Sequence, residues 1–206
     1  MKNYGVTMIR EQMDDIPEIP FPKGFGIRNY RPGEGYIWTR IQRAAEPFIK
    51  IDDGLFEREF GHNLPAMEER CFFVITDEGE EIGTITAWWN PNRKGKDWGQ
   101  IHWLAIHPDY QGRRLAKPAM TVAMKRLKQS HRRCFLGTST RRIVAIKVYL
   151  DFGFYPDLEV ENSQEAWAEV ASVLEHPTLK AIEFYNRNSQ PSGKYIRNDA
   201  NKNLDS

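Results

Sequence analysis

The sequence predicts an α+β fold in which helices flank a mixed, mostly antiparallel sheet. Three β-rich runs follow one another as a meander over residues 71–106. A strand–helix–strand–helix order then continues to residue 154, which requires a helix to cross between two parallel strands. Such crossovers are almost always right-handed, so we expect that hand here.

Ahead of the meander, extended and helical segments alternate. Three prolines between residues 17 and 22 predict that residues 14–26 are extended or looped between two short strands. A strand and two helices should follow, at Phe25–Tyr30, from the Pro32-Gly33 turn to about Ala45, and at Leu55–Asn63.

The meander consists of three runs rich in β-branched and aromatic residues. The first two are separated by an Asp-Glu-Gly-Glu tight turn, and the second and third by a polar hairpin loop at Asn90–Asp97. The three runs are Cys71–Thr76, Ile82–Trp89 and Trp98–Ile106.

The crossover helix is expected at Arg114–Gln129, where apolar residues recur every fourth position from Leu115. It leads to a strand at Arg133–Gly137, parallel to Trp98–Ile106. Another helix, Arg142–Phe152, should end at Gly153, a favourable residue after a helix.

The C-terminal part carries weaker signals. Short helices are expected at Glu165–Leu174 and Leu179–Tyr185. Residues 1–187 are expected to form a single domain with its core motif at 71–154, and the polar residues 188–206 to form a flexible tail.

The composition narrows the class of protein. The 206 residues carry a net charge of +1, so no strong field indicates nucleic acid or a membrane. The basic run at residues 125–133 is interpreted as the solvated face and exit of a helix. No apolar run approaches a membrane span, no signal peptide is recognised, and Cys71 and Cys134 are expected to be buried free thiols. A cytoplasmic protein is expected.

The five histidines and two cysteines show no metal-ligand spacing, so no metal site is predicted.

The most informative stretch is residues 107–117, His-Pro-Asp-Tyr-Gln-Gly-Arg-Arg-Leu-Ala-Lys, between a strand end and a helix start. The first turn of a helix presents unpaired N–H groups and the positive end of the helix dipole, which together suit a phosphate. Gly112 permits a tight backbone, Ala116 permits close approach, and Arg113, Arg114 and Lys117 add positive charge. A plain strand–helix turn with surface arginines would show the same pattern, so these residues alone leave both interpretations open.

Two segments in the right order resemble the GNAT superfamily of acetyl-CoA-dependent acetyltransferases. The first is residues 104–116, which are similar to the family's strand, His-Pro and Gln/Arg-x-x-Gly-x-Gly/Ala helix start. The second is residues 145–154, which resemble its Ala-Ile-x-x-Tyr-x-x-x-Gly-Phe segment. The resemblance covers residues 71–154 and extends plausibly back to Phe25.

The resemblance implies a GNAT-like fold whose crossover carries a coenzyme A site, with acetyl-CoA as co-substrate. The backbone at Leu104, Ala105 and Ile106 would pair with the pantetheine arm and supply the oxyanion donor. The diphosphate-binding turn would comprise Gln111, Gly112, Arg113, Arg114, Leu115, Ala116 and Lys117. The family usually has Gly where Arg114 stands and Asn near Arg142; Arg142 could hold a phosphate or the pantetheine instead.

The same resemblance implies catalytic roles. Tyr149 resembles the general acid that protonates the departing thiolate, although its spacing also suits a core aromatic. His102 resembles a histidine that moves the amine proton in arylalkylamine N-acetyltransferases; another histidine of that group would fall at Gln100. By period-two alternation His102 should share a face with Gln100 and Leu104. Weaker alternatives for the base are Glu46, Glu81 or water, and His107 is expected to be structural.

These expectations describe an N-acetyltransferase in which an amine attacks the thioester directly. The acceptor would be a small-molecule amine or a protein amine, and a homodimer stays open. The alternative is a non-catalytic GNAT-fold module that binds acyl-CoA for regulation. A different acyl donor or an O-acceptor is a third, weaker option.

Overall fold

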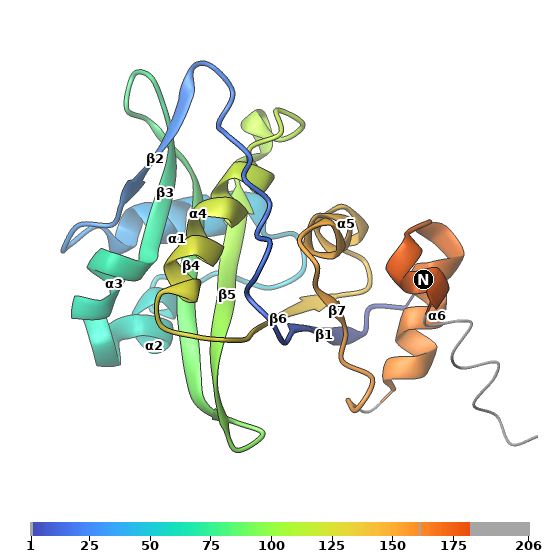
Figure 1. Cartoon of the computed structure of the whole chain (residues 1–206). Helices are drawn as coiled ribbons and strands as arrows, with labels where there is room; N and C mark the ends of the chain where they lie inside the picture. Colours follow the sequence, from blue (N-terminus) through green and yellow to red (C-terminus); the bar gives the residue numbers. More distant parts are fainter. Residues whose placement is uncertain (1, 161, 182–206) are drawn as a thin grey trace, which may run out of the picture.

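Seven strands form one mixed sheet in the order β2-β3-β4-β5-β6-β1-β7. The computed structural model describes residues 2–160 and 162–181 (Figure 1). The contact of β5 with β6 is parallel, and the other strand contacts in this part of the chain are antiparallel. The strands are β1 Gly5–Arg10, β2 Phe25–Asn29, β3 Cys71–Thr76, β4 Glu81–Arg93, β5 Lys96–Ile106, β6 Cys134–Ser139 and β7 Tyr155–Pro156.

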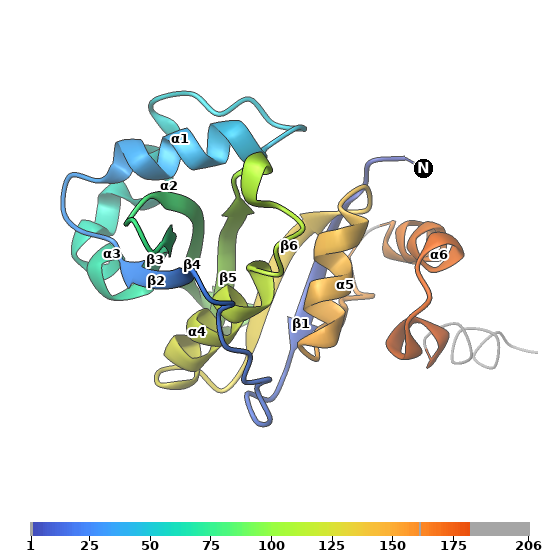
Figure 2. The ribbon, with the colours of Figure 1, turned by 90° about the horizontal axis from the view of Figure 1, so that it is seen from above.

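Helices cover both faces of this sheet, so the predicted α+β fold is confirmed. Figure 2 shows α1 on one face and α4 and α5 on the other. The α1 face packs around Trp38, Phe60 and Phe73, and the α4 face around residues such as Met120 and Phe154. The helices are α1 Gly35–Ala45, α2 Leu55–Phe60, α3 Leu64–Arg70, α4 Ala116–Lys128, α5 Ile143–Asp151 and α6 Ser163–Val173, with 3₁₀ turns at Gly61–Asn63 and Pro108–Tyr110.

The hairpin between β4 and β5 is tighter than the sequence pattern indicated. The prediction of a loop at Asn90–Asp97 is wrong, because the strands continue to a two-residue turn at Lys94 and Gly95. Both turn residues have positive φ, as a tight two-residue hairpin turn requires. Lys94 and Arg93 also bind the carboxylate of Asp157, at 3.0 and 2.7 Å, which anchors the tip.

Two helix boundaries differ from the predictions. The helix expected at Leu55–Asn63 becomes 3₁₀ after Phe60, and α3, which was not predicted, follows it. Pro65 lies in the first turn of α3, where proline is tolerated because that N–H has no helical partner. The helix expected from Arg114 begins instead at Ala116, since Arg114 is left-handed with φ 62°.

The C-terminal helix prediction is confirmed at α6, and residues 177–181 are also helical. The remainder of the helix predicted at Leu179–Tyr185, the domain end at 187 and the tail at 188–206 lie outside the described residues. Within the described ranges, no helix combines the length and apolar character needed to cross a membrane.

Both cysteines are buried free thiols, as predicted. Burial raises the pKa of the Cys71 thiol to about 12 and also raises the pKa of Cys134. Because the thiolate is the reactive form, neither side chain is a nucleophile in the folded protein.

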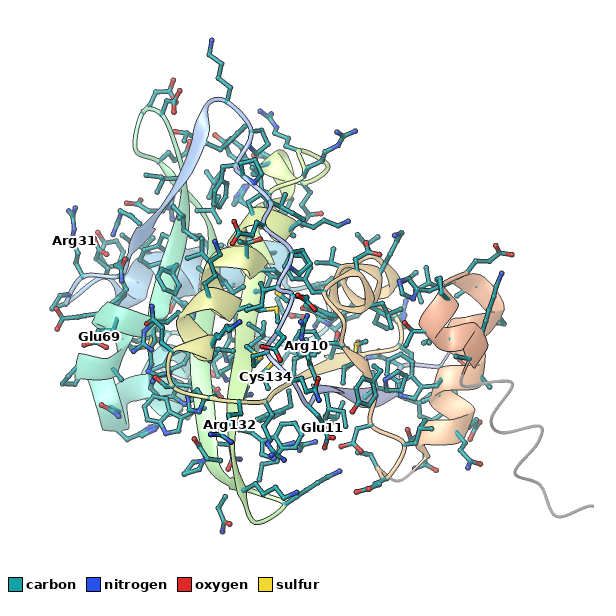
Figure 3. All side chains as sticks on the ribbon, viewed as in Figure 1. Arg10, Glu11, Arg31, Glu69, Arg132 and Cys134 are labelled. Atoms are coloured by element: carbon teal, nitrogen blue, oxygen red, sulfur yellow. The ribbon has the colours of Figure 1, made fainter. Side chains whose placement is uncertain are left out.

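Arg10 connects the start of the chain to the end of α5. Its register partner on β6 is Cys134, and both are labelled in Figure 3. The buried Arg10 guanidinium donates hydrogen bonds to the carbonyl oxygens of Phe152, Gln12 and Asp14. These bonds satisfy backbone acceptors at the end of α5 and in the loop after β1 that would otherwise lack this partner.

Replacement of Gly153 by alanine should destabilise this junction. Gly153 has φ 75°, and an added Cβ would lie 2.9 Å from Nη1 of Arg10. We expect Gly153→Ala to lower the free energy of unfolding by about 1–3 kcal/mol, measured by urea denaturation. Gly5→Ala is the matched control, because a Cβ at Gly5 meets nothing within 4 Å and should change stability little. Equal stabilities for the two variants would contradict the assignment.

Candidate active site

A β-bulge in β5 shapes the site. Thr86 pairs with His102 and Thr84 with Ala105, so Trp103 and Leu104 together lie opposite one residue of β4. Trp103 has φ 51°, a left-handed conformation that a bulky residue adopts only when its surroundings hold it there.

Two hydrogen bonds hold the bulge. The carbonyl oxygen of Trp103 accepts from Nε2 of Gln42 at 2.9 Å and from Oγ1 of Thr84 at 2.8 Å. The Gln42 amide also donates to Thr84 Oγ1 at 2.6 Å. Gln42 lies on α1 and is 2% exposed, so these bonds are shielded from water.

The direction of the Trp103 carbonyl fixes the direction of the next N–H. A trans peptide places its C=O and N–H on opposite sides, and no peptide bond in the described chain is cis. The N–H of Leu104 therefore points away from Gln42 and Thr84. Leu104 lines the cavity described next, so this N–H is suited to hydrogen-bond a bound oxygen there.

The cavity lies between β5 and β6. Their parallel pairing consists of Gly99 with Cys134 and Gln100 with Phe135, and beyond these pairs the strands line a cavity of about 560 Å³. Its remaining walls come from β1, the end of α1 with the loop after it, and α5. Four predicted site residues line it: His102, Leu104, Tyr149 and Arg142.

His102 lies at this cavity with both ring nitrogens hydrogen-bonded. Nε2 is 2.9 Å from Oε2 of Glu59, and Nδ1 is 3.1 Å from Nε2 of Gln100. The expectation that His102 shares a face with Gln100 is confirmed, but for Leu104 it is wrong. The bulge inserts a residue, so Leu104 packs with the α4 face while His102 contacts Phe60 on the α1 face.

Tyr149 enters the cavity from α5. It is 7% exposed and packs edge-to-face against Phe154, with ring centroids 6.3 Å apart. Burial raises the pKa of its phenol to about 12, although the nearby Arg142 opposes this. Tyr149 is therefore protonated throughout the physiological range.

Arg142 is engaged by a protein carboxylate. Its Nη2 lies 2.6 Å from both carboxylate oxygens of Glu46, a side chain only 6% exposed, and its guanidinium lies over the ring of Phe48. Arg142 thus joins the start of α5 to the loop after α1. Both carboxylates considered as alternatives for the base are held by arginines: Glu46 by Arg142, and Glu81 by Arg28 on β2.

The turn after β5 has the backbone of an anion site. Gly112 and Arg114 have φ 76° and 62°, and such alternation of left-handed residues turns successive N–H groups toward one concavity. A Cβ at Gly112 would meet nothing within 4 Å, so there is room for a ligand. This geometry fits a diphosphate bound at the start of α4.

The side chains of this turn differ in how far they are held by other residues. Leu115 is buried in the core, Gln111 donates to the carbonyl of Ile106, and Lys117 pairs with Asp151 at 2.8 Å. Arg113 and Arg114 are exposed, and Arg113 also donates to the carbonyl of Asp109 at 3.4 Å and lies over the ring of Tyr110. Ala116 is the first residue of α4.

The other residues expected at the cofactor contribute mainly through their backbone. Ala105 packs with the α1 face and Ile106 with the α4 face. His107 caps the 3₁₀ turn, where its Nδ1 accepts the N–H of Asp109 at 3.4 Å, as its expected structural role requires.

The sequence interpretation missed three polar groups of the site. Gln42 and Glu59 lie on helices whose polar faces look ordinary in the sequence, and only the packing brings them to β5. The third is Ser139, whose buried Oγ lines the cavity with no hydrogen-bond partner among the described residues.

Known proteins resemble this chain in sequence and fold. Residues 35–154 match the model of the Acetyltransferase (GNAT) family. A mycothiol acetyltransferase from Streptomyces coelicolor is 27% identical over 144 residues, which are 68% of this chain and 46% of that protein. Another, from Streptomyces bingchenggensis, is 24% identical over 174 residues, 78% of this chain and 52% of that protein. The chain therefore spans about half the length of the curated relatives it matches.

The fold is also similar to that of solved structures. A GCN5-related N-acetyltransferase from Sphaerobacter thermophilus superposes with a TM-score of 0.60 at 17% identity, covering 75% of this chain and 48% of that chain. At this identity the similarity concerns the fold alone.

Two substitutions at Arg114 should separate backbone strain from charge. Glycine adopts φ 62° without steric cost, so Arg114→Gly should raise the free energy of unfolding by up to about 1 kcal/mol, whereas Arg114→Ala should not. Both remove the same exposed charge, and both should weaken acetyl-CoA binding by a similar factor of about 3–10 in calorimetry. Unchanged affinity in both variants would show that Arg114 does not contribute to acetyl-CoA binding.

Proposed function

Because this chain belongs to the GNAT family of acetyltransferases, we propose that it transfers the acetyl group of acetyl-CoA to an amine by direct attack on the thioester. The bulge in β5 is the observation that carries the proposal. It turns the N–H of Leu104 away from Gln42 and Thr84, and Leu104 lines a cavity that Tyr149 and His102 also line. The names of the curated relatives, both acetyltransferases, support acetyl transfer in general.

In this mechanism the amine first loses a proton, because an alkylammonium with a pKa of about 10 has no lone pair for attack. His102 is the proposed acceptor of that proton, since imidazole exchanges protons near neutrality. The amine nitrogen then bonds to the thioester carbon, and the electron pair of the C=O moves onto oxygen. The N–H of Leu104 would stabilise this oxyanion, a type of contact worth about 10²–10³ in rate.

Attack leaves a positive charge on the amine nitrogen, so a second N–H proton passes to solvent as the tetrahedral intermediate collapses. Collapse breaks the carbon–sulfur bond and releases the amide and the thiolate. Tyr149 is proposed to donate a hydrogen bond to that sulfur. Full proton transfer from a phenol with a pKa of about 12 to the thiolate of a thiol with a pKa of about 8.5 is uphill. The phenol therefore contributes mainly by stabilising the departing charge, and solvent completes the protonation.

Donor binding would use the turn after β5. The N–H groups at residues 112–116 and the exposed Arg113 and Arg114 would hold the diphosphate. The pantetheine arm would lie between the separated ends of β5 and β6. Arg142, paired with Glu46, would shape the acceptor side of the cavity rather than bind phosphate.

A binding and turnover screen tests the proposal. Calorimetry with acetyl-CoA should show binding below millimolar concentration. A panel of small amines, lysine peptides and the acceptor substrate of mycothiol acetyltransferase should then give free thiol and an acetylated product by mass spectrometry. Absence of binding would overturn the proposal. Binding without thiol release would favour the alternative, a non-catalytic module that holds acyl-CoA.

Removal of the Tyr149 hydroxyl should slow turnover. We expect Tyr149→Phe to lower kcat about 10²-fold while the KM for acetyl-CoA changes little, because the hydroxyl acts on the departing sulfur. Tyr155→Phe is the matched control, since that tyrosine lies on β7 outside the cavity. Unchanged turnover in Tyr149→Phe would exclude Tyr149 from the mechanism.

The raised pKa of Tyr149 also makes a pH prediction. A donor with a pKa of about 12 keeps its proton well above the ordinary phenol value of 10. The kcat of the wild type should therefore not fall between about pH 8 and 10 through loss of the Tyr149 proton. Over this range the pH profile of Tyr149→Phe should have the same shape as that of the wild type. A loss centred near pH 10 that disappears in Tyr149→Phe would contradict the buried, protonated state.

A further inference from the structure

We propose that Glu59 is a positioning residue that holds His102 in one tautomer and balances the positive charge that His102 gains when it takes the proton of the acceptor amine. The inference rests on the proposed function, because it concerns the base of that reaction. It adds a carboxylate from α2 that the sequence interpretation did not consider.

One carboxylate oxygen of Glu59 makes the connection. Its Oε2 lies 2.9 Å from Nε2 of His102 and 3.1 Å from Nε1 of Trp103. An indole nitrogen can only donate, so Glu59 must be the acceptor of the Trp103 bond. Trp103 is itself held by the bulge and by an edge contact with Trp38, ring centroids 5.2 Å apart. The rigidly held indole of Trp103 therefore fixes the Glu59 carboxylate next to His102.

Gln100 defines the other side of the ring. Its Nε2 lies 3.1 Å from Nδ1 of His102, so in this arrangement the amide donates and Nδ1 carries the lone pair. Nε2 of His102 then carries the hydrogen and donates a hydrogen bond to the carboxylate of Glu59. Rotation of the Gln100 amide by half a turn would present Oε1 instead, which accepts from a protonated Nδ1. Gln100 can thus serve both charge states of the ring.

This arrangement accounts for the proton that the ammonium loses before attack. The Gln100 amide first turns and frees the lone pair of Nδ1. The ammonium N–H bond then breaks, its proton binds Nδ1, and the amine nitrogen keeps the electron pair that attacks the thioester. The ring becomes an imidazolium with Nε2–H directed at the Glu59 carboxylate and Nδ1–H at the turned Gln100 amide. Solvent later removes the proton and restores the neutral ring.

Glu59 is the carboxylate placed to balance the positive charge of the imidazolium. Glu46 and Arg142, two charged side chains that line the cavity, are paired with each other at 2.6 Å. Arg58, the neighbour of Glu59 on α2, pairs with Asp52 at 2.8 Å. The hydrogen bond from His102 lowers the pKa of Glu59, which keeps this carboxylate ionised and makes it a poor base in its own right.

A double-mutant cycle tests whether Glu59 acts through His102. We expect Glu59→Ala to lower kcat about 10- to 100-fold and to leave the KM for acetyl-CoA within about twofold. Added to His102→Ala, the same change should have an effect of less than about twofold. Glu59→Gln keeps an acceptor oxygen but not the charge, so it should retain more activity than Glu59→Ala and less than wild type. Glu57→Ala, an exposed carboxylate on the same helix, is the matched control and should match wild type.

Nitrogen NMR of the histidine side chains gives a readout that does not depend on activity. The His102 signals, assigned by their loss in His102→Ala, should show Nε2 protonated and Nδ1 unprotonated in the neutral ring. Its slowly exchanging Nε2–H should be seen in wild type and in Glu59→Gln, and should be lost in Glu59→Ala. Thermal melting monitored by circular dichroism establishes that each variant is folded.

The possible outcomes are distinguishable. A multiplicative loss in the double variant would show that Glu59 acts independently of His102 and would overturn the proposal. An Nε2–H that is equally protected in Glu59→Ala would do the same, even if no acceptor amine is turned over. If the NMR signature behaves as expected but no amine is acetylated, the proposed function fails while the Glu59–His102 link stands.

Discussion

The carbonyl oxygen of Trp103 accepts hydrogen bonds from Gln42 and Thr84, and these two bonds hold β5 in its left-handed bulge. A bulky residue in this conformation costs about 1–3 kcal/mol. Buried hydrogen bonds of about 0.5–1.5 kcal/mol each offset that cost, since water cannot compete for the carbonyl. The bulge is therefore maintained by α1 and β4, and it cannot be a property of β5 alone.

Much of the site follows from this one distortion. The inserted residue places His102 and Trp103 on the face of α1, where both can reach Glu59, and returns Leu104 to the face of α4. It also turns the carbonyl of Trp103 toward Gln42 and Thr84, so the N–H of Leu104 points away from these two side chains. The pairing of β5 with β6 stops just before it, at Gln100 and Phe135. A straight strand would close the cavity and separate these groups.

The sequence predicted features that depend on local pattern, and missed those that depend on distant partners. The meander, the crossover helix and the turn at residues 111–116 have local signals: β-branched runs, apolar periodicity, and glycine before a helix. The bulge has none, because Trp103 requires Gln42 from α1. Glu59 has none either, since a glutamate on a short surface helix is ordinary until Trp103 and His102 are placed beside it. The hairpin tip was misread for a similar reason, as the buried Asp157 that anchors Arg93 lies more than sixty residues away.

Two cations of the predicted cofactor site are paired with protein carboxylates. Lys117 and Arg142 are bound by Asp151 and Glu46, partners from elements that a motif does not include. The Glu46–Arg142 pair adds no net charge to the cavity that it lines, and taking an ammonium out of water costs more than taking the free amine. Deprotonation and binding of the acceptor are then coupled. His102, which is hydrogen-bonded to Glu59 and lies between the cavity and the α1 face, is placed to take that proton from the amine.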